Sequence, residues 1–190
     1  EFEGEKLFEL LLTKEQIGHI LAVLRKHQIP MVLEGPNYIY VDEKDFVDDP
    51  YVIYLRNELG ENLKSIIGTA QYEVNKLSAE LGNADVELVR KELGTEFDMI
   101  VHEPDGILEI GQAGHSKASG IERLCASLGI AKEDTYAFGD SANDVEMLEF
   151  VAHGIAMGNG TDVAKNAAEF VTTDIHKDGI WNGLKHYGLI

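Results

Sequence analysis

The stretch Ala137-Phe138-Gly139-Asp140-Ser141-Ala142-Asn143-Asp144 decides the predicted fold. The apolar run before Gly139 predicts a buried strand, and the polar cluster after it predicts a turn into a helix. Ser141 and Asp144 have the spacing of a helix N-cap pair. Asp140 lies outside that pair, at a strand end where open α/β sheets bind ligands. Three acceptors and a hydroxyl at one strand end favour a hard cation with phosphate nearby.

Strands and helices alternate around this stretch. We predict strands at 107–110, 135–139, 154–157 and 169–172, and helices at 117–128, 142–150, 161–167 and 178–187. Such alternation is typical of βαβ units and of a parallel sheet.

The preceding residues show a mixed pattern. We predict strands at 7–12, 30–33, 38–41, 73–80 and 97–101, helices after Thr13 and at 51–59 and 85–93, an acidic loop at 42–49 and a turn at 104–106. Residues 73–80 also fit helical spacing, and a strand is preferred there. Thr13 and Gln16 form a capping box. The predicted class is α/β, with an α+β domain at 1–105 and a partial Rossmann-like parallel sheet at 106–190.

Composition limits the function classes. An apolar fraction of 44% over 190 residues is ordinary for a globular protein. The net charge of −18 argues against nucleic-acid or anionic-membrane partners, although a metal and local cations would still admit a small anionic substrate. No apolar run approaches the ~18 residues of a membrane span. The single cysteine, Cys125, is predicted to pack in the core, excludes an internal disulfide and fits a cytoplasmic location.

Two further strand ends are candidates for the same site. Lys117 opens a predicted helix, where its charge opposes the helix dipole by a few tenths of a kcal/mol, and a bound anion would offset this cost. We predict Lys117 as a phosphate ligand, with a solvated lysine as the alternative. The loop 156–160 is either a tight turn or a wall of the same cleft. Trp181 and Tyr187 are predicted to anchor the core.

Three motifs carry a family resemblance. Ser116-Lys117, the stretch from Gly139 to Asp144, and Ala156-Met157-Gly158-Asn159 resemble the C-terminal half of the haloacid dehalogenase (HAD) superfamily, within it most nearly the Cof-type phosphatases with a C2 α/β cap. The resemblance is strong over 107–190 and rests on position and pattern over 1–105. It implies a substrate-selecting cap at 1–105 and the C-terminal part of a HAD-like core at 106–190.

The resemblance also implies an activity and residue roles. The family hydrolyses small phosphorylated metabolites, such as sugar phosphates, through an aspartyl-phosphate with Mg²⁺ as cofactor. Lys117 and Asn143 would bind the phosphate. Asp140, Ser141 and Asp144 would form the metal site, and Lys117, Asp140 and Asp144 would be catalytic.

One expected motif is missing. The family nucleophile lies in an Asp-x-Asp pair, and no such pair occurs in these 190 residues. We therefore expect the nucleophile segment to precede Glu1 and the chain as given to be inactive. A phosphomutase of similar architecture and a non-catalytic binding module are the alternatives, and a homo-oligomer is left open. Tyr38, Tyr40 and His102 are candidates for contact with the leaving group.

Overall fold

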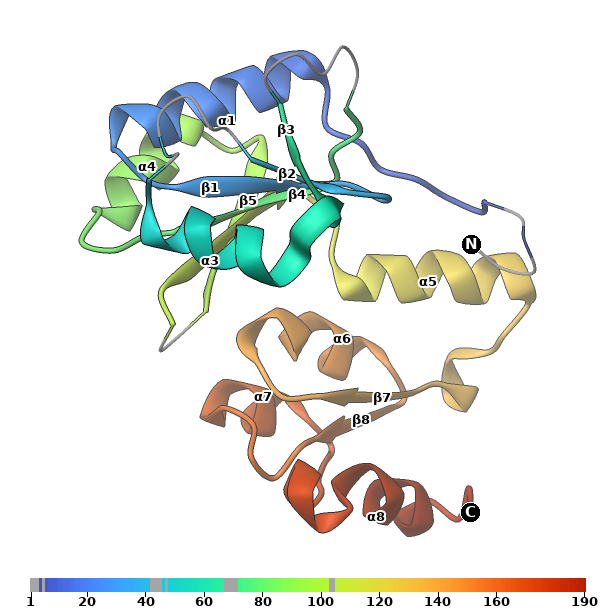
Figure 1. Ribbon diagram of the computed structural model, residues 1–190. Coiled ribbons are helices and arrows are strands. Elements are labelled where there is room, and N and C mark those ends of the chain that lie inside the picture. Colours follow the sequence, from blue (N-terminus) through green and yellow to red (C-terminus); the bar gives the residue numbers. More distant parts are fainter. Residues whose placement is uncertain (1–3, 5, 42–45, 47, 67–71, 103–104) are drawn as a thin grey trace. The chain divides into compact units, whose positions relative to one another are not determined.

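The computed structural model describes residues 4, 6–41, 46, 48–66, 72–102 and 105–190 (Figure 1). The chain divides into two compact units, which are described separately. The N-terminal unit comprises Phe8–Ala113, and the C-terminal unit comprises Glu1–Leu7 and Gly114–Ile190. Within the described ranges, no helix combines the length and the apolar character needed to cross a lipid bilayer.

The N-terminal unit is built on a six-stranded sheet of order β3-β2-β1-β4-β6-β5. Its strands are β1 (Met31–Glu34), β2 (Ile39–Val41), β3 (Leu63–Ser65), β4 (Lys76–Glu80), β5 (Phe97–His102) and β6 (Ile107–Gln112). All neighbours pair antiparallel except β2 and β3, which pair parallel. Helices α1 (Lys14–Lys26) and α4 (Val86–Leu93) lie on one side of the sheet, and α3 (Pro50–Leu59) lies on the other (Figure 1).

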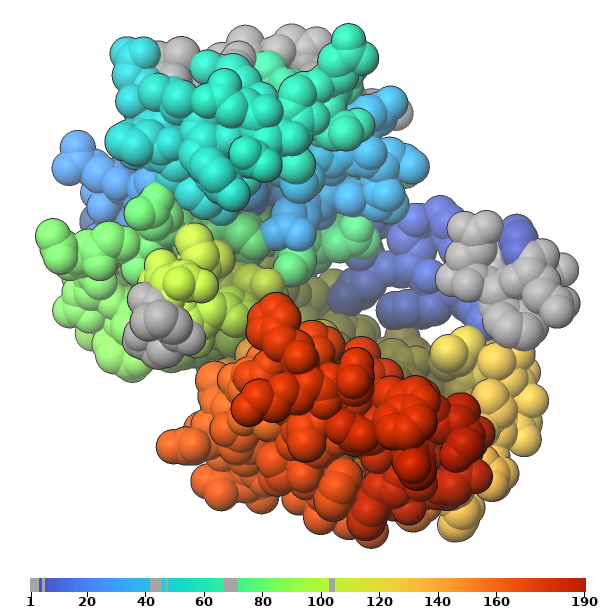
Figure 2. Space-filling model, turned by 60° about the horizontal axis from the view of Figure 1, so that its bottom comes forward, coloured from blue at the N-terminus to red at the C-terminus, as the bar shows by residue number. Residues whose placement is uncertain are grey.

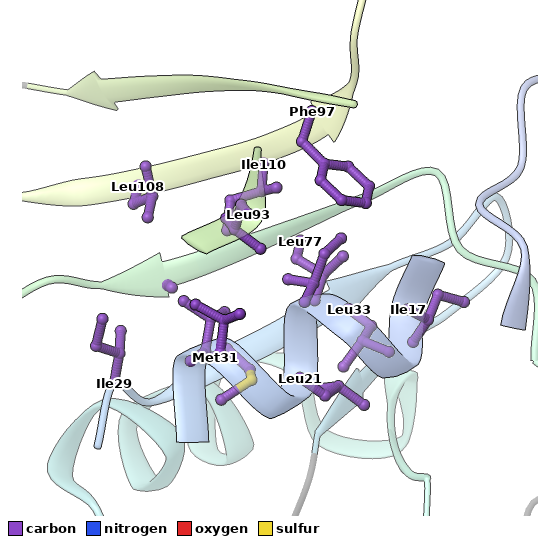
Figure 3. Close-up of a cluster of buried hydrophobic side chains, with 14 of the residues drawn as sticks. Ile17, Leu21, Ile29, Met31, Leu33, Leu77, Leu93, Phe97, Leu108 and Ile110 are labelled. Atoms are coloured by element: carbon purple, nitrogen blue, oxygen red, sulfur yellow. The ribbon is translucent and has the colours of Figure 1, made fainter. Parts of the chain in front are cut away.

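The core of this unit lies between the sheet and the pair α1 and α4. Figure 3 shows the side chains that meet there, among them Ile17, Leu21, Leu33, Leu77, Leu93, Leu108 and Ile110. Burying each such side chain stabilises the fold by about 1.5–3 kcal/mol. A smaller cluster of Val32, Val41 and Val52 packs under α3. The predicted capping box starts α1, since Thr13 N donates to Gln16 Oε1 (2.8 Å) and Gln16 N donates to Thr13 Oγ1 (3.2 Å).

The C-terminal unit contains the predicted parallel sheet, which confirms the α/β class. Its order is β7 (Tyr136–Gly139), β8 (His153–Ala156) and β9 (Phe170–Val171). The helices are α5 (Lys117–Leu128), α6 (Val145–Phe150), α7 (Asp162–Ala167) and α8 (Gly179–His186). Helix α8 packs closely on β7 because Gly183 has no side chain: a Cβ there would lie 2.5 Å from Cε1 of the Phe138 ring.

One predicted strand belongs to the other sheet. The segment 107–110 was expected to open the parallel sheet, but β6 pairs antiparallel with both β4 and β5. That placement was wrong. The two units accordingly divide between Ala113 and Gly114, beyond the predicted boundary at 105.

Other expectations also differ from the structure. Residues 7–12 were predicted as a strand, but the described segment makes separate hydrogen bonds, Leu12 N to Val74 O (2.8 Å) and Asn75 Nδ2 to Leu10 O (2.6 Å), rather than a ladder. Trp181 is 51% exposed and is no core anchor. Cys125 is only half-buried, and α5, the helix that contains it, has no fully buried residue. The acidic loop 42–49 and the turn 104–106 lie partly outside the described residues.

Candidate functional site

The loop after β7 folds back on the carboxylate of Asp144. A one-turn 3₁₀ helix (Ala142–Asp144) follows Ser141, and Ser141 with Asp144 forms the predicted capping box. Asp144 Oδ2 accepts hydrogen bonds from the backbone N–H groups of Asp140 (2.9 Å) and Ser141 (3.2 Å). Gly139 leaves room for this turn, since a Cβ at that position would lie 2.6 Å from Asp144 Cβ. The buried carboxylate therefore sets the backbone of the whole loop.

Lys117 reaches the same carboxylate from a different element. Its side chain leaves the first turn of α5, where Ser116 is the N-cap, and its Nζ donates to Asp144 Oδ1. The same ammonium lies 3.4 Å from Asn143 Oδ1. The structure thus brings together Lys117, Asn143 and Asp144, three of the residues that the family resemblance assigns to the site.

The electrostatics favour an ionised Asp144. Burial alone would raise the pKa of Asp144, but the Lys117 ammonium and the backbone N–H groups of Asp140 and Ser141 stabilise the charged form and outweigh it. The pKa of the carboxyl is therefore lowered. An ionised Asp144 holds the Lys117 ammonium in place, while the lysine side chain stays 49% exposed and can reach an anion.

Asp140 is held by its backbone, and its side chain is exposed. Its carbonyl oxygen accepts from Thr161 N (2.8 Å) and from Thr161 Oγ1 (3.2 Å). Gly160 packs against it, because a Cβ there would lie 3.0 Å from Asp140 Cα. Among the described residues, no side chain pairs with the Asp140 carboxylate. A fixed backbone with an uncommitted carboxylate is a suitable arrangement for binding a ligand or a cation.

The loop 156–160 is hydrogen-bonded to the segment that follows β9. Asn159 Oδ1 accepts from Ile175 N (2.9 Å), and Gly158 N donates to Thr173 O (3.1 Å). The Asn159 side chain is therefore used to tie the loop to the segment after β9. Sequence reasoning missed the part played by Thr161, although its position as N-cap of α7 was a readable signal.

The metal-binding capacity of the loop is limited. In the part of the chain that the structure describes, no three His, Cys, Asp or Glu residues gather to hold a metal ion. Asp140 offers one free carboxylate, Ser141 Oγ donates to Asn143 Oδ1 (2.6 Å), and both Asp144 oxygens already accept hydrogen bonds. A hard cation such as Mg²⁺ takes six oxygen ligands, several of them water. The loop fits one side of such a site.

Comparison with known proteins identifies the family. Residues 1–184 match the family of haloacid dehalogenase-like hydrolases, and the chain belongs to that family. A relative from Bacillus subtilis, the 5-amino-6-(5-phospho-D-ribitylamino)uracil phosphatase YitU, is 36% identical over 70% of this chain and 47% of its own length. A phosphoglycolate phosphatase from Halobacterium salinarum is 30% identical over 85% of each chain. The chain spans about half the length of the B. subtilis relatives.

Solved structures agree with this assignment. A hypothetical protein from Geobacillus kaustophilus matches with a TM-score of 0.79 and 31% identity, over 100% of this chain and 73% of that one. A HAD subclass IIB sugar phosphatase matches with a TM-score of 0.80 over 98% of this chain and 71% of its own. At 23% identity, the second match shows the shared fold alone.

Proposed function

We propose that the protein containing these residues is a Mg²⁺-dependent phosphohydrolase acting on a small phosphorylated metabolite. One observation carries the proposal. The Lys117 ammonium is fixed between Asp144 and Asn143, next to a loop that presents the free carboxylate of Asp140. The family membership and the phosphatase names of several relatives support it.

Each residue of the site has a distinct task. Lys117 and Asn143 bind the phosphoryl oxygens, and the fixed ammonium stabilises the charge that develops there in the transition state. Asp140, with the Ser141 hydroxyl beside it, would hold Mg²⁺, which when bound screens the repulsion between an anionic nucleophile and an anionic substrate. Asp144 was predicted as a metal ligand as well. Because both of its oxygens are occupied, we assign it to positioning Lys117 and the Asp140 backbone.

The nucleophile comes from elsewhere. The sequence contains no Asp-x-Asp pair, so we propose that an aspartate outside residues 1–190 attacks the phosphorus. Its carboxylate oxygen forms the new P–O bond as the ester P–O bond breaks. The leaving alcohol takes up a proton, and water then hydrolyses the aspartyl-phosphate. The 190-residue chain alone is accordingly expected to show no phosphatase activity. The N-terminal unit would act as the cap that selects the leaving group.

Hydrolysis of p-nitrophenyl phosphate by the intact protein tests this proposal. Asp140→Asn should weaken the dependence on Mg²⁺, and Asp140→Asn and Lys117→Ala should each reduce turnover at least about tenfold. Asp162→Asn removes an equally exposed carboxylate from α7 and serves as the matched control. Calorimetric titration of Mg²⁺ into the same variants provides a readout independent of turnover.

The outcomes separate the alternatives. Unchanged hydrolysis and unchanged Mg²⁺ binding in Asp140→Asn would remove this residue from the metal site. Normal turnover in Lys117→Ala would make it an ordinary solvated lysine. A protein that transfers phosphate to a second hydroxyl without releasing it would be a phosphomutase, and one that binds phosphate esters without turnover would be a binding module.

A further inference from the structure

The sheet of the N-terminal unit carries a polar cluster on the side away from its main core. Side chains alternate between the two faces of a strand, so Leu77 and Ala79 of β4 face α1 and α4 while Lys76 and Ser78 face the other way. Residues paired directly across strands share a face. The ladder therefore places seven polar residues of β1, β4, β5 and β6 on one surface: Glu34, Lys76, Ser78, Glu80, Asp98, His102 and Glu109. We call this surface the polar face.

The same register separates the predicted leaving-group contacts. Tyr40 pairs with Leu33 and is buried in the main core, on the opposite side of the sheet from His102. Tyr40 and His102 therefore cannot contribute to one surface of this sheet. Of the two, only His102 lies on the polar face.

The polar face is a connected network across β1, β4 and β6, and the buried Nε2 of His102 on β5 lies beside it without a hydrogen bond. Glu34 faces Lys76 and Ser78 faces Glu109 in the ladder. Ser78 Oγ donates to Glu34 Oε1, and Lys76 Nζ lies 3.5 Å from Glu34 Oε2 and 3.0 Å from Glu109 Oε1. His102 Nε2 lies 3.3 Å from the same Glu109 oxygen. The backbone ladder holds these groups in place before any ligand arrives.

Burial distinguishes this network from an ordinary solvated face. Ser78 is 7% exposed, and the side chains of Glu109 and His102 are 24% and 22% exposed. Burial by itself lowers the pKa of Lys76, but the hydrogen bonds to Glu109 and Glu34 outweigh it and raise the pKa. Charged groups this enclosed are costly unless they are paired or serve a ligand.

The charge of the polar face restricts what it can bind. Four carboxylates and one lysine ammonium share this face, and burial together with Glu34 and Glu80 raises the pKa of the neighbouring Tyr51 to about 12. The surface therefore repels a phosphate group. Among the described residues, Glu109 Oε2 takes part in no hydrogen bond or ion pair, and Lys76 has three N–H donors for two carboxylates. An acceptor and a donor remain, fixed side by side.

We propose that the polar face binds vicinal hydroxyl groups of an uncharged polyol segment. One hydroxyl donates to Glu109 Oε2, and its neighbour accepts from the Lys76 ammonium. The proposal rests on the proposed function: the polyol is the part of the phosphorylated metabolite that carries no phosphate. Glu109 and Lys76 then become specificity-determining residues. Preorganisation by the sheet reduces the entropic cost of ordering the protein side chains when a ligand binds.

Titration of the 190-residue chain with unphosphorylated ribitol, followed by amide NMR shifts, tests the proposal. We expect saturable shifts at Ser78, Glu109 and their neighbours on β4 and β6, with affinity reduced at least about tenfold in Glu109→Gln. Glu87→Gln makes the same chemical change on an exposed helix of the same unit and should leave the affinity unchanged. Glu109→Asp keeps the charge but withdraws the oxygens by one methylene, and should also weaken binding if the other variant fails to fold.

Two results would overturn the proposal. One is the absence of saturable shifts up to about 100 mM ribitol. The other is equal affinity of the parent chain and folded Glu109→Asp. Because ribitol carries no phosphate, its binding does not depend on Lys117 or Asp140. A failure of the phosphatase proposal would therefore leave ribitol binding intact, and the two failures can be told apart.

Discussion

Replacing Asp144 by asparagine should destabilise the C-terminal unit. The carboxylate is 4% exposed and accepts from Lys117 and from the backbone N–H groups of Asp140 and Ser141. An asparagine amide offers one acceptor oxygen and turns an NH₂ group toward the remaining donors. A hydrogen bond to a charged group contributes about 1.5–3 kcal/mol, and Lys117, being half exposed, recovers part of its loss in water. We expect the free energy of unfolding to fall by about 2–4 kcal/mol.

Urea unfolding monitored by tryptophan fluorescence measures the loss of stability in the C-terminal unit. The chain has a single tryptophan, Trp181, and α8 places it in the C-terminal unit. With a urea slope of about 1–3 kcal/mol per M, the unfolding midpoint should fall by about 0.7–4 M.

A matched substitution isolates the buried carboxylate. Asp162→Asn makes the same chemical change at an exposed position of α7 and should alter the free energy of unfolding by less than about 0.5 kcal/mol. Equal midpoints for Asp144→Asn and the parent chain would refute the reasoning, because three donors would then lose an ionised partner without cost.

Two further predictions concern the loop after β7, one on the pH dependence of Asp144 and one on the substitution of Gly139. Since the pKa of Asp144 is lowered in the folded chain, its carboxylate stabilises the fold fully above the unfolded pKa of about 4, and this stabilisation is lost as the pH falls through the lower folded pKa. The urea midpoints of Asp144→Asn and the parent chain should therefore differ at about pH 6 and lie closer together at about pH 3. A constant difference at both pH values would contradict this. Gly139→Ala should cost about 1–3 kcal/mol, because the added Cβ would lie 2.6 Å from Asp144 Cβ. Gly120→Ala in α5 meets nothing within 4 Å and should be neutral or stabilising by up to ~1 kcal/mol, so a similar loss in both variants would exclude the steric explanation.

The loop of the candidate site was readable from the sequence because its signals are local. Gly139 ends the strand, and Ser141 and Asp144 cap the following helix at a spacing of three residues. The shared site of Lys117, Asn143 and Asp144 followed from the family resemblance and not from the order of strand ends, because the strand before Lys117 lies in the other sheet. The hydrogen bonds from Thr161 to the Asp140 carbonyl oxygen were missed, because an N-cap residue predicts the start of a helix but not which distant carbonyl group it will reach.

The misplacement of the strand predicted at 107–110 had a different cause. A helix follows this strand, as it would in a βαβ unit, but partner choice in a sheet depends on non-local packing. A strand buried on both faces of a parallel sheet reads as a continuous apolar run, whereas β6 buries Leu108 and Ile110 and places Glu109 between them. That alternation fits an antiparallel sheet with one polar face. Glu109, the residue that distinguishes the two arrangements, is also the centre of the network that we propose binds hydroxyl groups.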